Sequence, residues 1–178
     1  EALLSDYLVK KAESKEARIG ILAAELETIR STIYRQTLFS EFERAVHGFV
    51  EAGTPVTAAL LDETYAGLIK RYYGLGFTVA ANDGMEWAYI PHFYYKYYVY
   101  SYATGLSCGI AIAENVKANG QPAVDGYLQM LSGGCSEPPL DLLKKAGVDL
   151  TKPDAINAAL ARFDRIVGEL AELLGVKL

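Results

Sequence analysis

Apolar residues recur every three or four positions along most of the chain, and this spacing constrains the fold more than any other feature. The last segment shows it most clearly, because six of its apolar side chains fall on one face of a helix opened by Lys152-Pro153-Asp154. No stretch keeps the alternation of apolar and polar residues that marks a half-buried strand. The sequence therefore predicts an all-α protein with a helical bundle-like architecture. The six residues are Ile156, Leu160, Phe163, Ile166, Leu170 and Leu173.

Capping and turn residues divide the chain into separate helices. Ser14 is suited to cap the second helix, because its hydroxyl can accept a hydrogen bond from a free backbone N–H. Residues 74–84 are rich in glycine and small side chains and predict a loop, and residues 85–91 predict an irregular segment or one short helical turn. Half of the 178 residues are apolar, which is enough for a single helical domain over residues 1–178. The expected helices cover 2–12, 15–51, 58–73, 92–119, 121–132 and 139–147, with the last one starting at 154.

The charge of the chain argues against two classes of partner. The net charge is −5 and the pI is near 5.1, whereas nucleic acids and anionic membrane surfaces attract basic proteins. The longest uncharged run, residues 97–113, is shorter than the ~20 apolar residues that a membrane span needs. Cys108 and Cys135 belong to no CxxC motif, so we expect buried or free thiols, rather than a disulfide, in a reducing, cytoplasmic compartment.

The segment 92–102 holds six tyrosines and one histidine in eleven residues. A buried phenol needs a hydrogen-bond partner, so a core built for stability alone would use phenylalanine and leucine here. The composition therefore favours a polar cleft with an aromatic wall. If a helix begins at His92, Tyr95 and Tyr102 share one face because they lie seven residues apart, with Tyr98 beside them. An aromatic core stripe, whose hydroxyls reach backbone or water, fits the same spacing.

Other candidate motifs are weaker. Gly74-Leu-Gly76 lacks the third glycine and the preceding strand of a dinucleotide fingerprint, so it indicates a loop with unusual dihedrals or a mobile loop near a site. His47 lies in the middle of a predicted helix, which favours a surface or hydrogen-bonded histidine over a ligand. The chain contains no H-E-x-x-H and no acidic or histidine cluster with metal-ligand spacing.

The run IPHFYYKYYVYSYATG, residues 90–105, closely resembles the C-terminal part of oligoendopeptidase F, a thimet-oligopeptidase-like zinc metallopeptidase. Residues 1–12, 35–43 and 147–151 resemble the same family, so the likeness spans essentially the whole chain. The resemblance implies the helical C-terminal part of a zincin-like catalytic domain. The implied reaction is hydrolysis of peptide bonds in oligopeptide substrates.

The resemblance also implies which parts of the enzyme lie outside this sequence. The family binds zinc through H-E-x-x-H and a downstream glutamate, and the glutamate of H-E-x-x-H is the general base. By register, Glu1 resembles a glutamate shortly after the third zinc ligand, so we expect the sequence to begin just past the metal site. Zinc is then the cofactor of the full-length enzyme, with no metal held by this chain's own ligands. The missing N-terminal part is an expected partner, and self-association through exposed apolar faces is another.

The family's substrate-binding histidine and tyrosines fall on the tyrosine-rich segment. In the family these side chains bind the substrate backbone and stabilise the oxyanion of the tetrahedral intermediate. An ungapped alternative register puts Tyr97 and Tyr100 in the site. A hypothesis of a different class is a helical peptide-binding or interaction module without chemistry. The predicted catalytic residues are His92, Tyr95 and Tyr102, and the predicted substrate-binding residues are Tyr97, Tyr98 and Tyr100.

Overall fold

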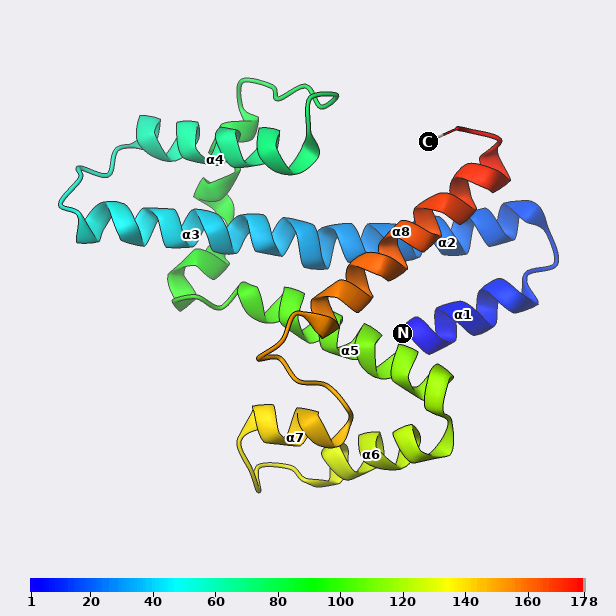
Figure 1. Ribbon diagram of the computed structural model, residues 1–178. Coiled ribbons are helices and arrows are strands. Elements are labelled where there is room, and N and C mark those ends of the chain that lie inside the picture. The colour runs from blue at the N-terminus through cyan, green and yellow to red at the C-terminus, as the bar shows by residue number, and fades with distance from the viewer. Residues whose placement is uncertain (178) are drawn as a thin grey trace. The chain divides into compact units, whose positions relative to one another are not determined.

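The computed structural model describes residues 1–177 and confirms the all-α prediction, because these residues form helices and no strand (Figure 1). A π-helical turn, η1 (Arg30–Tyr34), and two 3₁₀ segments, η2 (Asp83–Tyr89) and η3 (Pro91–Tyr95), accompany the α-helices. The α-helices are α1 (Ala2–Lys11), α2 (Lys15–Ile29), α3 (Arg35–Glu51), α4 (Ala58–Tyr73), α5 (Tyr100–Asn119), α6 (Gln121–Ser132), α7 (Pro139–Lys145) and α8 (Asp154–Leu174).

Local signals account for several helix ends. The Ser14 hydroxyl accepts a hydrogen bond from the Ala17 amide at 3.1 Å, which confirms the predicted cap of α2. The Thr57 hydroxyl caps α4 in the same way, accepting from the Leu60 amide at 3.3 Å. Gly74 ends α4 with φ +76°, a conformation that glycine adopts without a steric penalty. The helix predicted over 15–51 is found as α2, η1 and α3 in succession.

The helix predicted over 92–119 is wrong at its start. α5 begins at Tyr100, and residues 91–95 form the 3₁₀ segment η3. Between them, Lys96 and Tyr97 adopt φ values of +44° and +53°, which a right-handed helix cannot contain. Tyrosine and lysine gave no sign of this break, because neither is a typical turn residue.

The described chain divides into two compact units, each with its own core. Unit 1 comprises residues 1–30 and the chain from Thr104 onward, and unit 2 comprises residues 31–103. The core of unit 2 joins α3 and α4 to Val99, through Leu38, Phe39, Phe42, Tyr65, Leu68 and Ile69. The core of unit 1 includes Cys108, Ile112, Ala146, Val148 and Ala155. A single domain over 1–178 stays a prediction.

A buried arginine connects four helices of unit 1. Arg162 on α8 is 1% exposed and donates hydrogen bonds to Asp6 on α1, Glu25 on α2 and Glu114 on α5. Burial alone would raise the pKa of Asp6, but hydrogen bonds from Arg162 and Lys117 outweigh it and lower that pKa. A buried charge is tolerated only when it is paired in this way, so the network defines how these helices pack.

We predict that Arg162→Met destabilises the chain by about 3–5 kcal/mol, because it leaves three carboxylates near a buried position without their shared partner. Urea unfolding followed by circular dichroism measures the change. Arg165→Met is the matched control: Arg165 is 52% exposed and pairs with Glu114 at the surface, so its loss should cost less than about 1 kcal/mol. Equal effects of the two substitutions would contradict the prediction.

Candidate functional site

The break before α5 determines where the predicted site residues lie. Pro91 opens η3, which carries His92 and Tyr95. Tyr98 lies in the turn that follows the positive-φ residues, and Tyr102 lies in the first turn of α5. The four side chains therefore come from three successive elements of unit 2, and not from one helical face.

These four residues nevertheless come together, and we call them the tyrosine cluster. The His92 imidazole and the Tyr98 ring stack with centroids 5.9 Å apart and an interplanar angle of 13°. The Tyr102 hydroxyl lies 3.4 Å from His92 Nε2, a distance that suits a weak hydrogen bond. Tyr98 meets Tyr95 and Tyr102 edge to face, at centroid distances of 6.2 and 5.4 Å.

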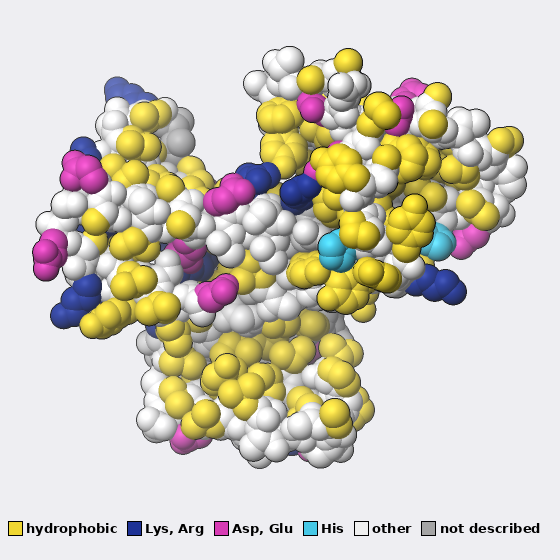
Figure 2. Space-filling view, turned by 180° about the vertical axis from the view of Figure 1, so that it is seen from behind, with side chains coloured by type: hydrophobic (Ala, Val, Ile, Leu, Met, Phe, Trp, Pro, Cys, Tyr) yellow, Lys and Arg dark blue, Asp and Glu magenta, His cyan; other side chains and the backbone are white. Residues whose placement is uncertain are grey.

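The tyrosine cluster lies at the surface. Tyr95 and Tyr98 are 62% and 45% exposed, whereas the neighbouring Val99 is fully buried. Val99 therefore fills the core position of this segment. Tyr95 and Tyr98 do not form the aromatic core stripe that the same spacing allowed. Figure 2 shows both histidines of the chain, in cyan, among hydrophobic side chains in yellow. The arrangement offers imidazole and phenol groups to a ligand, while the catalytic and substrate-binding roles stay predictions.

Tyr97, from the alternative register, has a different neighbour. Its ring packs against the imidazole of His47 on α3, with centroids 4.6 Å apart. The His47 imidazole thus has an aromatic partner, a contact that the sequence did not predict. Tyr100 begins α5 and is exposed.

Glu43 on α3 is the residue of the site that the sequence analysis missed. It is only 3% exposed, and its Oε1 accepts a hydrogen bond from the backbone N–H of Tyr97. This bond satisfies a backbone donor at the point where the chain leaves helical geometry. A signal was present in the sequence, because Glu43 interrupts the apolar stripe of α3 next to Phe42.

A second set of hydrogen bonds fixes η2 against α4. The buried Tyr65 hydroxyl donates to Glu86 at 2.5 Å, Glu86 also pairs with Arg35, and Trp87 Nε1 donates to Asp62 at 2.8 Å. Burial and the Glu86 hydrogen bond raise the pKa of Tyr65. This packing anchors the end of loop 74–84, whose interpretation as a mobile loop stays a prediction.

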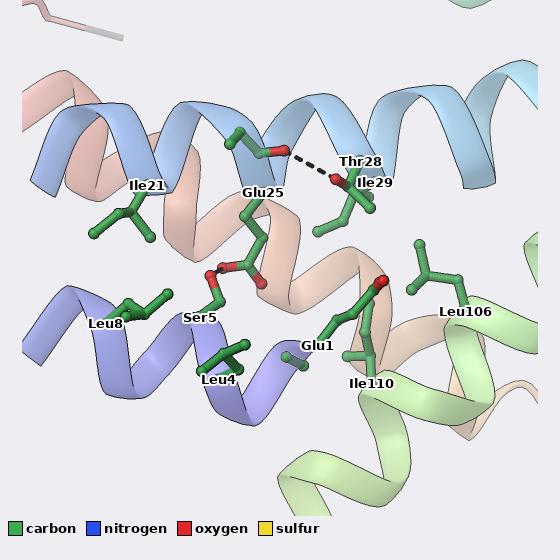
Figure 3. Close-up of a pocket in the computed structure, with 12 residues that line it drawn as sticks. Glu1, Leu4, Ser5, Leu8, Ile21, Glu25, Thr28, Ile29, Leu106 and Ile110 are labelled. Carbon is green, nitrogen blue, oxygen red and sulfur yellow. Dashed lines mark hydrogen bonds between the residues drawn. The ribbon is translucent and has the colours of Figure 1, made fainter. Parts of the chain in front are cut away.

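An apolar hollow in unit 1 is a separate feature (Figure 3). It has a volume of about 370 Å³ and lies between α1, α2 and α5. Leu4, Leu8 and Ile110 contribute apolar side chains, and Ser5 donates a hydrogen bond to Glu25 at 2.6 Å. Its lining includes none of the predicted site residues.

Two further findings concern metals and membranes. Among residues 1–177, no group of three or more histidine, cysteine, aspartate or glutamate side chains is arranged to hold a metal ion. Within the same range, no helix has the length and apolar character to cross a membrane. Cys108 is buried, Cys135 is exposed and both are free.

A comparison with family models gives the class of protein to which this helical chain belongs. The model of peptidase family M3 matches residues 1–162. The chain belongs to peptidase family M3, which confirms the family resemblance found in residues 90–105.

Individual relatives agree with this assignment. The chain is 46% identical to oligopeptidase PepF of Bacillus subtilis over 174 residues, which cover 98% of the chain and 26% of the relative. It is 41% identical to group B oligopeptidase PepB of Streptococcus agalactiae, over 98% of the chain and 29% of the relative. The crystal structure of oligoendopeptidase-F from Enterococcus faecium matches 97% of the chain with a TM-score of 0.92 and 37% identity, and 33% of that structure is covered. The chain thus spans between about a quarter and a third of these proteins.

We predict that Tyr102 keeps its proton to a higher pH than an ordinary tyrosine. Interaction with the Tyr98 hydroxyl raises the pKa of the Tyr102 phenol, and a phenol is a neutral hydrogen-bond donor below its pKa. A ¹³Cζ-tyrosine NMR titration, with Tyr102→Phe to assign the signal, measures this pKa. The resonance should move only above pH ~10. A signal that moves below that pH would contradict the prediction.

Proposed function

We propose that this chain is the C-terminal part of the catalytic domain of a zinc-dependent oligoendopeptidase, which hydrolyses peptide bonds in short peptides. The observation that carries the proposal is the cluster of His92, Tyr95, Tyr98 and Tyr102, with Tyr95 and Tyr98 exposed, in a chain of peptidase family M3. An oligopeptide is then the substrate, and these four residues are the contribution of this chain to its binding and conversion.

In this proposal Tyr102 stabilises the oxyanion of the tetrahedral intermediate. Its raised pKa keeps the hydroxyl protonated, so it can donate a hydrogen bond to a developing negative charge. His92 Nε2, 3.4 Å from the Tyr102 hydroxyl, orients that hydroxyl and offers a second polar contact. Tyr95 serves as a further donor beside them, and one preorganised donor contributes roughly 3 kcal/mol to the transition state.

Tyr98 supports the substrate backbone in the same proposal. Its ring stacks on His92 and meets Tyr102 edge to face, so it fixes the positions of both side chains. Its own surface is exposed and is free to contact an extended peptide. Tyr97 and Tyr100 contribute to binding farther along the peptide, and they replace Tyr95 and Tyr102 if the alternative register holds.

Zinc enters the proposal only through other parts of the enzyme. The described residues supply no ligand set that fits the metal, so we assign zinc and the general base to a segment that precedes these residues in the parent protein. Zinc there would activate the attacking water. The chain described here would face that segment and complete the cleft.

The surface of α1 supports a further peptidase segment as a partner. Leu3, Leu4, Tyr7 and Leu8 are all exposed, and α1 has no buried residue. A row of large apolar side chains at the surface marks a contact region. The missing peptidase segment would cover this face, and self-association would cover it in a detached chain.

The two free thiols, Cys108 and Cys135, suit a reducing compartment, so the proposed location of the protein is the cytoplasm.

A second candidate function is a peptide-binding module without chemistry. The exposed aromatic cluster favours it, because stacked tyrosine rings bind peptides without any catalytic group. The two candidates differ in what Tyr102 does, since only the peptidase uses its hydroxyl in a transition state.

We predict that Tyr102→Phe lowers kcat about 10²- to 10³-fold in a longer M3 peptidase that contains these residues, because a donor to the oxyanion is lost. KM for a quenched oligopeptide should change much less, since the ring remains. Tyr89→Phe is the control, because Tyr89 is an exposed tyrosine of unit 2 outside the cluster. An unchanged kcat would remove Tyr102 from catalysis, and a loss in Tyr97→Phe instead would favour the alternative register.

We also predict that the 178-residue chain alone does not cleave peptides. It lacks H-E-x-x-H in its sequence and a metal-ligand group among its described residues. Incubation of the highly purified chain with a quenched oligopeptide and added zinc should give no fluorescence increase above buffer. Cleavage that copurifies with the chain and disappears in Tyr102→Phe would show that this prediction is wrong.

A further inference from the structure

Helix α1 contacts the rest of unit 1 through its less apolar side. Its large apolar side chains are exposed, and no residue of the helix is buried. Apolar burial is the main force that attaches an amphipathic helix to a core, so α1 gains little from it and depends on polar contacts instead. The partly buried residues of the helix are Ala2, Ser5, Asp6 and Val9.

A buried arginine supplies the central polar contacts of α1. Arg162 on α8 is 1% exposed and donates hydrogen bonds to the Asp6 carboxylate at 2.9 Å and to the Ala2 carbonyl at 3.2 Å. Lys117 on α5 pairs with Asp6 as well, at 2.9 Å. Hydrogen bonds between charged groups are stronger than neutral ones, so Asp6 is the main point of attachment of α1.

The arginine does not depend on α1 in return. Its Nε donates to Glu25 on α2, and its Nη1 donates to Glu114 on α5 at 2.9 Å. If α1 moves away, Arg162 keeps two carboxylate partners and Asp6 becomes hydrated. The Ser5 hydroxyl, which donates to Glu25 at 2.6 Å, exchanges this acceptor for water (Figure 3). The movement therefore leaves no buried charge without a partner, which is the usual obstacle to breaking a buried ion pair.

Hollows lie on both sides of the first turn of α1. One has a volume of about 370 Å³ and lies between α1, α2 and α5 (Figure 3), and another of about 250 Å³ lies between α1, α5 and α6. Ala2, Leu106 and Ile110 line both hollows, so the first turn of α1 separates them. Packing with such gaps gives up part of the van der Waals attraction. If α1 moves away, the two hollows become one apolar groove along α5.

The connection to α2 allows α1 to move without its neighbour. Residues 12–14 join the two helices, and Ser14 caps α2 through the Ala17 amide, so α2 keeps its own N-terminus. Helix α1 is 10 residues long, and an isolated helix of this length is marginal in water. A detached α1 therefore loses its backbone hydrogen bonds, and amide hydrogen exchange reports the movement directly.

We propose that α1 is a strap that detaches from unit 1 as one piece, with the bond between Arg162 and Asp6 as its latch. In the closed state the strap separates the hollows beside Leu106 and Ile110. In the open state these two side chains line a single groove, while the other helices of unit 1 keep their packing. The proposal rests on the contacts of α1 and stands whether or not the parent protein is a peptidase.

Native-state hydrogen exchange on the unaltered chain tests the strap. The amides of residues 5–11 should exchange at least about 10²-fold faster than the slowest amides of α8, at rates that low concentrations of urea leave unchanged. The α8 amides should exchange faster as urea is added, because their exchange requires global unfolding. Equal rates and equal urea dependence in α1 and α8 would overturn the proposal.

The pattern along the helix separates a strap from simple fraying. A strap opens as one piece, so protection should be the same at each amide of residues 5–11 after correction for intrinsic exchange rates. Fraying opens the terminal turns first, so protection would rise steadily from Ser5 to Lys11. Such a gradient would overturn the proposal.

Three variants test the latch. Asp6→Asn keeps an oxygen acceptor but removes the charge that pairs with Arg162, so α1 amides should exchange at least about 10-fold faster. Glu13→Gln removes the same charge from an exposed position beside α1 and should leave their exchange unchanged. Val148→Ala weakens the core cluster of unit 1, which contains no residue of α1, and should speed exchange in α8 but not in α1.

Two outcomes with these variants would contradict the latch. Equal acceleration in Asp6→Asn and Glu13→Gln would mean that overall charge governs α1. A Val148→Ala effect as large in α1 as in α8 would mean that α1 opens only when the whole unit unfolds. If Asp6→Asn fails to fold, the urea dependence measured on the unaltered chain decides the question.

Discussion

The hydrogen bond from the Tyr97 amide to the buried Glu43 carboxyl is the interaction on which the candidate site depends. Lys96 and Tyr97 both have positive φ values, and each such residue costs about 1–3 kcal/mol when it is not glycine. The chain tolerates this conformation where Val99 is fully buried next to it and Glu43 accepts a hydrogen bond from the Tyr97 amide. The resulting turn separates η3 from α5 and allows His92, Tyr98 and Tyr102 to meet.

The two carboxyl oxygens of Glu43 differ in their surroundings. One carboxyl oxygen accepts the hydrogen bond from the Tyr97 amide, and the other is buried without a hydrogen-bond partner among residues 1–177. A buried carboxyl group is expensive unless both oxygens are satisfied. Its presence on the apolar side of α3 therefore has a structural reason at Tyr97.

The sequence predicted the helices, apart from the start of α5, and the members of the cluster. It did not predict the turn at Lys96 and Tyr97 that brings these members together. Ser14, Thr57 and Gly74 end or begin helices through local hydrogen bonds or local dihedrals, so their effect is visible without tertiary contacts. The cluster of His92, Tyr95, Tyr98 and Tyr102 was expected from a spacing of seven residues on one helix, and the reason was wrong. The residues meet because a contact with α3, 54 positions away in sequence, interrupts the helix. A partner this distant leaves no periodic pattern, so the break in the apolar stripe of α3 at Glu43 did not indicate which group the carboxylate contacts.

The central claim is that the bond between Glu43 and Tyr97 assembles the tyrosine cluster. Nuclear Overhauser contacts between the ring protons of His92 and Tyr98 measure that assembly directly, because the two rings stack 5.9 Å apart. The contacts should persist in Glu43→Gln, which retains an acceptor for the Tyr97 amide, and should disappear in Glu43→Ala, which has none, while helical circular dichroism is retained in both. Unchanged contacts in Glu43→Ala would contradict the account.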